Sequence, residues 1–275
     1  MDDQVRPARG GVVNTARWVS NLVSGHLHDA GYERRPYPDW DVGRGDTFVL
    51  SNVHVLDVDG GRLAEADHVV VAGDEIVELV TSDQLASVRD RHPSAREFDG
   101  GGRFLVPGLS DIHCHVSLVT EFGVGARQIR YLDGQRLRNV EAALENGCTF
   151  VRDCGGAVEQ IGNLRAEVEA GRLVGPRIIT SMNAISPRGG MWDVGRVMSK
   201  LAEPLFGGRY MRFPDGRDGL IAAMAEIDES GCDFFKTYFE QRPLYGGDEN
   251  DVYTMFSSEE AMTIRTTADR FGKPG

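Results

Sequence analysis

The sequence predicts an α/β fold in which a small unit of β-strands precedes the first half of a parallel (β/α)8 TIM-type barrel. Two patterns along the 275 residues indicate this organisation. Residues 45–103 hold short β-branched runs separated by Asp and Gly turns, which is typical of small antiparallel sheets. Within residues 104–275, apolar strands alternate with helices four times, as in parallel βα units. Since a barrel of this type needs eight units, the sequence supplies about half of one.

The bulk composition is that of an ordinary globular protein, with 41% hydrophobic and 26% charged residues. A formal net charge of -12 argues against nucleic acid or an anionic membrane as the main partner. No apolar run reaches the roughly 18 residues of a membrane-spanning helix, and residues 1–10 lack the apolar core of a secretory signal. The scattered cysteines predict reduced thiols and a cytoplasmic location; they are Cys114, Cys148, Cys154 and Cys232.

Residues 1–44 differ in composition from the rest of the chain. They contain Arg9-Gly10 and Pro36-Tyr37-Pro38, and one short amphipathic segment at 16–23. We expect an N-terminal extension that is partly disordered.

The β unit is predicted from four short runs rich in β-branched residues: 47–50, 53–56, 68–71 and 75–79. The segment 57–61 predicts a hairpin turn, in which Asp59-Gly60 is the turn signal. The runs are too short and too few to close a barrel of their own, so they need a partner surface.

The barrel part is predicted from strands and helices in strict alternation. The expected strands are 104–113, 148–153, 177–181 and 232–239, and the expected helices are 128–146, 158–170, 220–230 and 257–271. Gly147, Gly175 and Gly231 each fall between a helix and the next strand, where a left-handed C-cap is expected. The long segment 183–219 is a candidate substrate loop, and residues 272–275 resemble a turn into a fifth strand.

A His-x-His pair ends the first predicted barrel strand. The two-residue period places His113 and His115 on one face, at the strand end where barrel enzymes hold their active sites. Two neutral imidazoles on one face can share a zinc ion. His26 and His28 have the same spacing but lie in the polar extension, so context rather than spacing distinguishes the two pairs.

The context is the segment 101–115, GGRFLVPGLSDIHCH, which resembles the signature of the amidohydrolase superfamily. In that family the signature follows a small β-sandwich, here residues 45–103, and begins the barrel. Segments 142–156 (AALENGCTFVRDCGG) and 171–178 (GRLVGPRI) are similar to the imidazolonepropionase-like and Xaa-Pro dipeptidase-like branch. The resemblance spans 47–275, which would be the N-terminal part of such a protein. Asp111, two residues before His113, is a candidate to orient a metal ligand.

Lys236 lies within the apolar strand predicted at 232–239. A buried ammonium is costly, so the residue either extends to water or serves a chemical role. The family resemblance implies that Lys236 reacts with CO2 and that its carbamate bridges two metal ions. Tyr238 is two residues further on the same face, where the resemblance implies a substrate-binding group; a core-filling role is the alternative.

The sequence departs from the family pattern in two places. No histidine follows His115, so the ligands that the family takes from strands five and six, and its catalytic aspartate after strand eight, have no counterpart. Where relatives of this branch often read Gly-Gly-His, residues 189–193 read GGMWD, so the contribution of that histidine is either missing or replaced by Trp192 or Asp193. The catalytic residue is therefore unassigned.

We expect a metal-dependent hydrolase of C–N bonds in an amide, cyclic amide or dipeptide-like small molecule. One or two divalent ions, zinc by default, would be held by His113, His115 and Lys236 and would supply an activated hydroxide. Two alternatives stay open: a mononuclear deaminase of the same fold, and a catalytically inactive fragment or pseudoenzyme. A homo-oligomer or a second chain that completes the barrel is the expected macromolecular partner.

Overall fold

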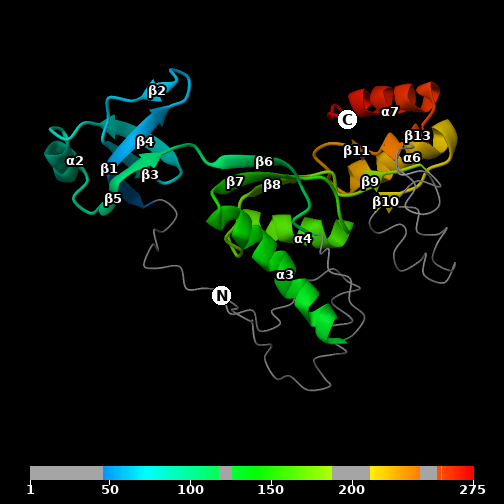
Figure 1. The fold of residues 1–275 in the computed structure, drawn as a ribbon, viewed down its shortest axis with the longest axis horizontal. Coiled ribbons are helices and arrows are strands. Elements are labelled where there is room, and N and C mark those ends of the chain that lie inside the picture. Colours follow the sequence, from blue (N-terminus) through cyan, green and yellow to red (C-terminus); the bar gives the residue numbers. More distant parts are fainter. Residues whose placement is uncertain (1–45, 118–125, 188–210, 242–252, 255) are drawn as a thin grey trace. The chain divides into compact units, whose positions relative to one another are not determined.

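The computed structural model describes residues 46–117, 126–187, 211–241, 253–254 and 256–275 (Figure 1). They form two compact units, which divide between Gly108 and Leu109. The predicted N-terminal extension with His26 and His28, and the GGMWD segment with most of 183–219, lie outside the described residues. No helix among the described residues is long and apolar enough to cross a membrane. All four cysteines are free thiols.

The first unit is a five-stranded sheet with one helix. Its strands follow the order β2-β1-β3-β4, and β5 pairs with β1 in parallel, whereas the other pairs are antiparallel. The elements are β1 Thr47–Asp57, β2 Arg62–Leu63, β3 His68–Ala72, β4 Glu75–Val80, α2 Leu85–Arg91 and β5 Arg96–Leu105.

Strand β1 corrects the sequence interpretation of this unit. The runs 47–50 and 53–56 are one strand, interrupted by a bulge at which Asn52 takes a positive φ of 55°. A bulge inserts an extra residue without ending the strand, so it breaks the local pattern but not the pairing. The predicted hairpin turn is confirmed, and the Asp57 carboxylate accepts the N–H of Gly60 at 2.9 Å.

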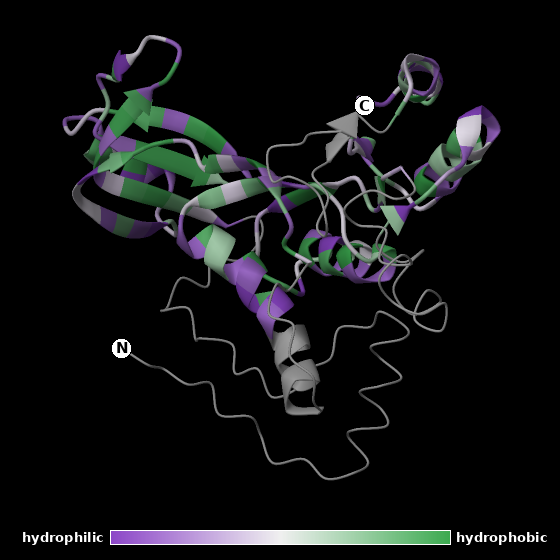
Figure 2. Ribbon diagram, turned by 45° about the vertical axis from the view of Figure 1, so that its right-hand side comes forward, coloured by the Kyte–Doolittle hydropathy of each residue, from purple (hydrophilic) through white to green (hydrophobic). Residues whose placement is uncertain are grey.

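The partner surface that the short strands need is the helix α2, which the sequence analysis did not predict. Val88 of α2 is fully buried and packs in one cluster with Val49, Val70 and Val80. In Figure 2 the strands of this unit are predominantly hydrophobic in colour. With seven residues and one buried side chain, α2 is too short to show a helical period in the sequence.

The second unit alternates parallel strands with helices, as predicted. Strands β6, β7 and β8 form one parallel sheet, and β10, β9 and β11 form another. The Asp233 N–H donates to the Thr180 carbonyl at 2.8 Å and so joins the segment before β11 to β8. The elements are β6 Leu109–Cys114, α3 Ala126–Glu145, β7 Cys148–Asp153, α4 Val158–Glu169, β8 Arg177–Thr180, β9 Ala184–Ile185, β10 Met211–Arg212, α6 Gly216–Glu229, β11 Lys236–Thr237, β12 Glu240–Gln241, β13 Tyr253–Thr254 and α7 Ser258–Arg270.

The strand predicted at 104–113 is two strands in two units. Phe104 belongs to β5 and β6 begins at Leu109, with Pro107 and Gly108 between them. The expectation of a buried strand is wrong, since Phe104, Leu109 and Ile112 are exposed by 68%, 58% and 67%. For β6 the reason is that it pairs only with β7 among the described residues, so its outer edge lacks a neighbour there.

Two of the three predicted glycine caps are confirmed, because Gly147 and Gly231 have φ values of 84° and 83°. The third prediction is wrong. Helix α4 ends earlier, and Gly171 takes the left-handed conformation with φ 69°. Gly175 serves close packing instead, because a Cβ there would lie 2.3 Å from Cγ1 of Val140 on α3.

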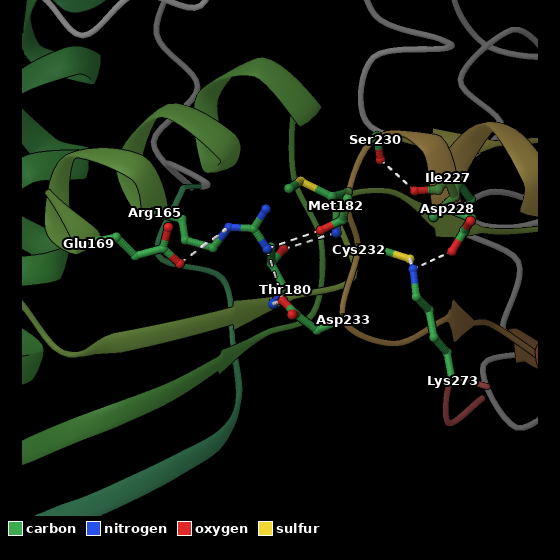
Figure 3. A network of polar contacts seen from close by, with 11 residues as sticks. Arg165, Glu169, Thr180, Met182, Ile227, Asp228, Ser230, Cys232, Asp233 and Lys273 are labelled. Atoms are coloured by element: carbon green, nitrogen blue, oxygen red, sulfur yellow. Dashed lines mark hydrogen bonds and ion pairs between the residues drawn. The ribbon is translucent and has the colours of Figure 1, made fainter. Parts of the chain in front are cut away.

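Polar contacts at partly exposed positions join the helices of this unit to a strand and to one another. Figure 3 shows Asp233 between Arg165 of α4 and Thr180 of β8, whose N–H it accepts at 2.8 Å. Lys273, just beyond α7, pairs with Asp228 of α6. The fully buried apolar side chains between these elements include Val140, Ile161, Leu164, Ile185, Leu220 and Met224.

We expect Val70→Ala to destabilise the first unit by about 2 kcal/mol, because Val70 is fully buried and its truncation leaves a cavity. Hydrogen exchange of the β3 amides, read by mass spectrometry, should accelerate by about 30-fold. Val77→Ala on β4 is the matched control: Val77 is 46% exposed, and we expect a change of at most about 0.5 kcal/mol. Equal effects of the two variants would contradict the assigned core.

Candidate metal centre

The predicted His-x-His pair lies at the carboxyl end of β6. His113 is within the strand and His115 follows it directly. Their imidazole centroids are 5.8 Å apart with the ring planes at 61°. Both rings therefore occupy one small region at the strand end, as the sequence predicts.

Lys236, the first residue of β11, lies in the same region, although β11 belongs to the sheet β10-β9-β11 and β6 to the sheet β6-β7-β8. Its Nζ lies 3.5 Å from Nε2 of His113, although 123 positions separate the two residues in sequence. The Lys236 ammonium also lies over the Tyr238 ring, 4.9 Å from its centroid. The structure thus brings Lys236 beside His113 on one side and Tyr238 on the other.

Lys236 sets the electrostatics of this cluster. Its positive charge lowers the pKa of His113, and partial burial and the neighbouring His115 act in the same direction. A lowered pKa keeps His113 neutral at pH 7, and neutral imidazole is the form that binds a metal ion. Burial raises the pKa of Tyr238, so its hydroxyl keeps the proton and can donate a hydrogen bond.

His115 is held by the backbone that follows β7. Its Nδ1 lies 2.8 Å from the carbonyl oxygen of Gly155. A carbonyl can only accept, so Nδ1 carries the proton and Nε2 keeps its lone pair in the neutral ring. Nε2 is therefore the atom of His115 that could bind a metal.

Two polar residues of β7 belong to this region but carry no assigned role in the sequence analysis. Asp153 is fully buried and accepts the N–H groups of Val116 at 2.7 Å and Gly155 at 2.9 Å. Arg152 places its guanidinium 3.8 Å from the ring centroid of Phe234. The available signal was a charged pair at the end of an apolar strand, directly before a Gly-Gly turn.

Asp111 does not contact the imidazole that it was expected to orient. Its carboxylate accepts the backbone N–H of His113 at 3.0 Å. The contact fixes the strand end at His113, and the Asp111 charge acts to raise the pKa of His113 against the larger opposite effect of Lys236.

The residues present fit a metal ion only if Lys236 changes its chemical form. Among the described residues, no group of three or more His, Cys, Asp or Glu could hold a metal. A lysine ammonium offers no lone pair, whereas its carbamate offers two carboxylate-like oxygens. His113, His115 and a carbamate at Lys236 would form a nitrogen and oxygen donor set that suits zinc.

Comparison with known proteins supports the resemblance seen in the sequence. No protein-family model matches the chain. A solved prolidase, complexed with N-methylphosphonate-L-proline, is similar with a TM-score of 0.64 and 29% identity, over 82% of this chain and 54% of that one. A solved amidohydrolase is similar with a TM-score of 0.65 and 27% identity, over 82% and 55%. Adenine deaminase of Cereibacter sphaeroides is 39% identical over 87 residues, which are 30% of this chain and 14% of that enzyme.

These structural neighbours are members of the amidohydrolase superfamily, and the chain is similar to them in fold. It spans about half the length of the solved relatives. The two histidines of the signature segment 101–115 lie at the end of β6, His113 within the strand and His115 directly after it.

The charge of Lys236 makes a specific prediction for His113. In metal-free and bicarbonate-free buffer, His113 should titrate below the ordinary histidine pKa of about 6.5. Lys236→Met should raise the pKa of His113 toward that value, because the charge with the largest effect on the imidazolium is removed, while Arg152 remains. Lys236→Arg retains the charge and should keep the pKa low. Histidine NMR resonances followed against pH measure this, and an unchanged pKa in Lys236→Met would refute the assigned cause.

Proposed function

We propose that the protein is a metal-dependent hydrolase of C–N bonds whose metal site includes His113, His115 and Lys236. The observation that carries this proposal is the 3.5 Å approach of Lys236 Nζ to His113 Nε2. A lysine at this place is otherwise a disadvantage, since an ammonium beside two histidines repels any metal cation. Its conversion to an anionic carbamate removes that repulsion and adds oxygen ligands.

We further propose that β6, β7, β8 and β11 are the first four strands of a (β/α)8 barrel, and that the sheet of β1–β5 belongs to a sandwich subdomain. The parallel pairing of β6-β7-β8 and the hydrogen bond from Asp233 to Thr180 support this order. Helices α3, α4 and α6 lie between successive strands in the chain, as in such a barrel.

Carbamate formation is a balanced step on Lys236 itself. The neutral amine nitrogen attacks the carbon of CO2, a new N–C bond forms, and the nitrogen gives up one proton to solvent. The half-buried position of Lys236 leaves its Nζ accessible to a molecule as small as CO2. Arg152, whose charge also acts on His113, is a second cation that favours the anionic product.

The bound metal would supply a hydroxide at neutral pH and polarise the carbonyl of the substrate. The chain's own residues have separate tasks. His113 presents Nε2 toward Lys236, and the hydrogen bond of His115 Nδ1 to Gly155 leaves its Nε2 to face a metal. Tyr238 keeps a phenolic proton that can be donated to a substrate carboxylate or carbonyl. Tyr238 stands beside Lys236, so a substrate held by its hydroxyl would lie next to the metal ligands.

The proposed substrates are small amides, cyclic amides and dipeptide-like molecules. The solved relatives support this class, since one is a prolidase complexed with a proline-containing phosphonate and another is an amidohydrolase. The nearby carboxylates of Asp111 and Asp153 accept backbone N–H groups, and we propose that a further segment or a second chain supplies the catalytic carboxylate.

A mononuclear deaminase is the second candidate; the local identity with adenine deaminase favours deamination as the reaction. Such a site would use His113 and His115 without a carbamate at Lys236. The two candidates therefore differ in metal stoichiometry and in the mass of the lysine.

Zinc binding tests the site directly. The purified protein, incubated with zinc and bicarbonate, should retain the metal by elemental mass spectrometry and gain the mass of one CO2 at Lys236. His113→Ala should lower zinc affinity by roughly tenfold or more. His26→Ala, from the pair with the same spacing in the N-terminal extension, is the matched control and should leave zinc binding unchanged. Zinc retention that is lost only in the His26 variant would contradict the assignment.

Turnover distinguishes the candidate activities. We expect hydrolysis of one or more members of a panel of N-acyl amino acids and Xaa-Pro dipeptides, and loss of that hydrolysis in Lys236→Met. Release of ammonia from adenine, with one metal per chain and a free amine at Lys236, would favour the deaminase. A protein that binds zinc but turns over no member of either panel would support the inactive interpretation.

A further inference from the structure

We propose that Asp153 is a positioning residue for His115, acting through the backbone of Gly155 so that Nε2 of His115 is presented to the metal. This inference rests on the proposed metal site. The sequence analysis assigned no role to Asp153 or Gly155.

The Asp153 carboxylate ties together the chain segments that follow two neighbouring strands. One oxygen accepts the N–H of Val116, directly after His115, at 2.7 Å. The other oxygen accepts the N–H of Gly155, after β7, at 2.9 Å. The Asp153 main-chain carbonyl accepts the N–H of Ser181, after β8, at 3.1 Å. Three strand ends are thus fixed by one residue that is fully buried.

Gly155 links this fixed backbone to the imidazole of His115 and so orients the ring. Its N–H is bound by Asp153, and its carbonyl accepts the Nδ1 proton of His115 at 2.8 Å. The hydrogen bond selects the Nδ1–H tautomer, which leaves the lone pair on Nε2. The Asp153 carboxylate therefore binds the N–H of Gly155, and the His115 imidazole binds the carbonyl of the same residue.

Residue 155 must be glycine for this arrangement. Its φ of +107° is one that side-chain-bearing residues rarely adopt, and a Cβ would lie 3.1 Å from the buried Oγ of Ser181. The next residue, Gly156, donates its N–H to the Met182 carbonyl at 2.9 Å. Contacts on both sides thus define the direction of the Gly155 carbonyl.

Asp153 is suited to positioning and unsuited to direct catalysis. Both of its oxygens accept backbone N–H groups, and no part of its side chain is exposed to a substrate. An amide in its place would turn an NH2 group toward one of these N–H donors, so at least one hydrogen bond would be lost.

The experiment compares Asp153→Asn with the unmodified protein in two measurements. The first is the tautomer of His115 in the metal-free protein, read from the 15N shifts of the imidazole. The second is zinc affinity, read by competition with a chelator. We expect a loss of the Nδ1–H preference and a roughly 10- to 100-fold decrease in zinc affinity.

Asp233→Asn is the matched control, because Asp233 also accepts a backbone N–H at a strand end but has no contact with His115 among the described hydrogen bonds. It should leave both measurements unchanged. If Asp153→Asn does not fold, Gly155→Ala tests the same chain of contacts with the carboxylate retained, and it should show the same two losses.

A folded Asp153→Asn variant with the original tautomer and the original zinc affinity would overturn the proposal. If the unmodified protein binds no zinc, the metal site itself is wrong. The tautomer measurement still decides the positioning role in that case, because it requires no metal.

Discussion

Parallel pairing of β6, β7 and β8 is the constraint on which the candidate site depends. The register places Cys114 beside Asp153 and Asp153 beside Thr180, so the three strands end at one level. Lys236 reaches that level through the pairing of β11 with β9. Parallel strands present all their carboxyl ends at the same edge, which is why groups distant in sequence can share one site. A shift of β6 by one residue would turn His113 away from Lys236.

The sequence predicted the βα elements well where local signals agreed with tertiary packing. Strand β7 matches its predicted bounds, because β-branched and aromatic residues lie between two glycines that end the strand and the preceding helix. Helix α7 is marked by the capping box of Ser257 and Glu260. The bulge at Asn52 and the seven-residue α2 escaped prediction, since both depend on contacts that a local pattern does not contain.

The proximity of the candidate side chains could be predicted from the sequence, whereas the backbone contacts around them could not. His113 and Lys236 were assigned from the family resemblance, and the structure places them in contact. The carbonyl of Gly155, which holds His115, has no sequence identity, because every residue carries a carbonyl. The one nearby sequence signal is Asp153, two residues before Gly155, because a carboxylate in an apolar strand indicates a specific role. Hydrogen bonds that use the main chain depend on φ and ψ values, which the sequence does not state.

The exposed outer edge of β6 affects how the chain associates with other molecules. Leu109 and Ile112 present apolar surface beside backbone groups that, among the described residues, pair only on the β7 side. Such an edge invites pairing with a strand of another molecule. A chain that exposes such an edge while it folds is prone to association, so a strand that pairs with β6 would protect the molecule as well as extend the sheet.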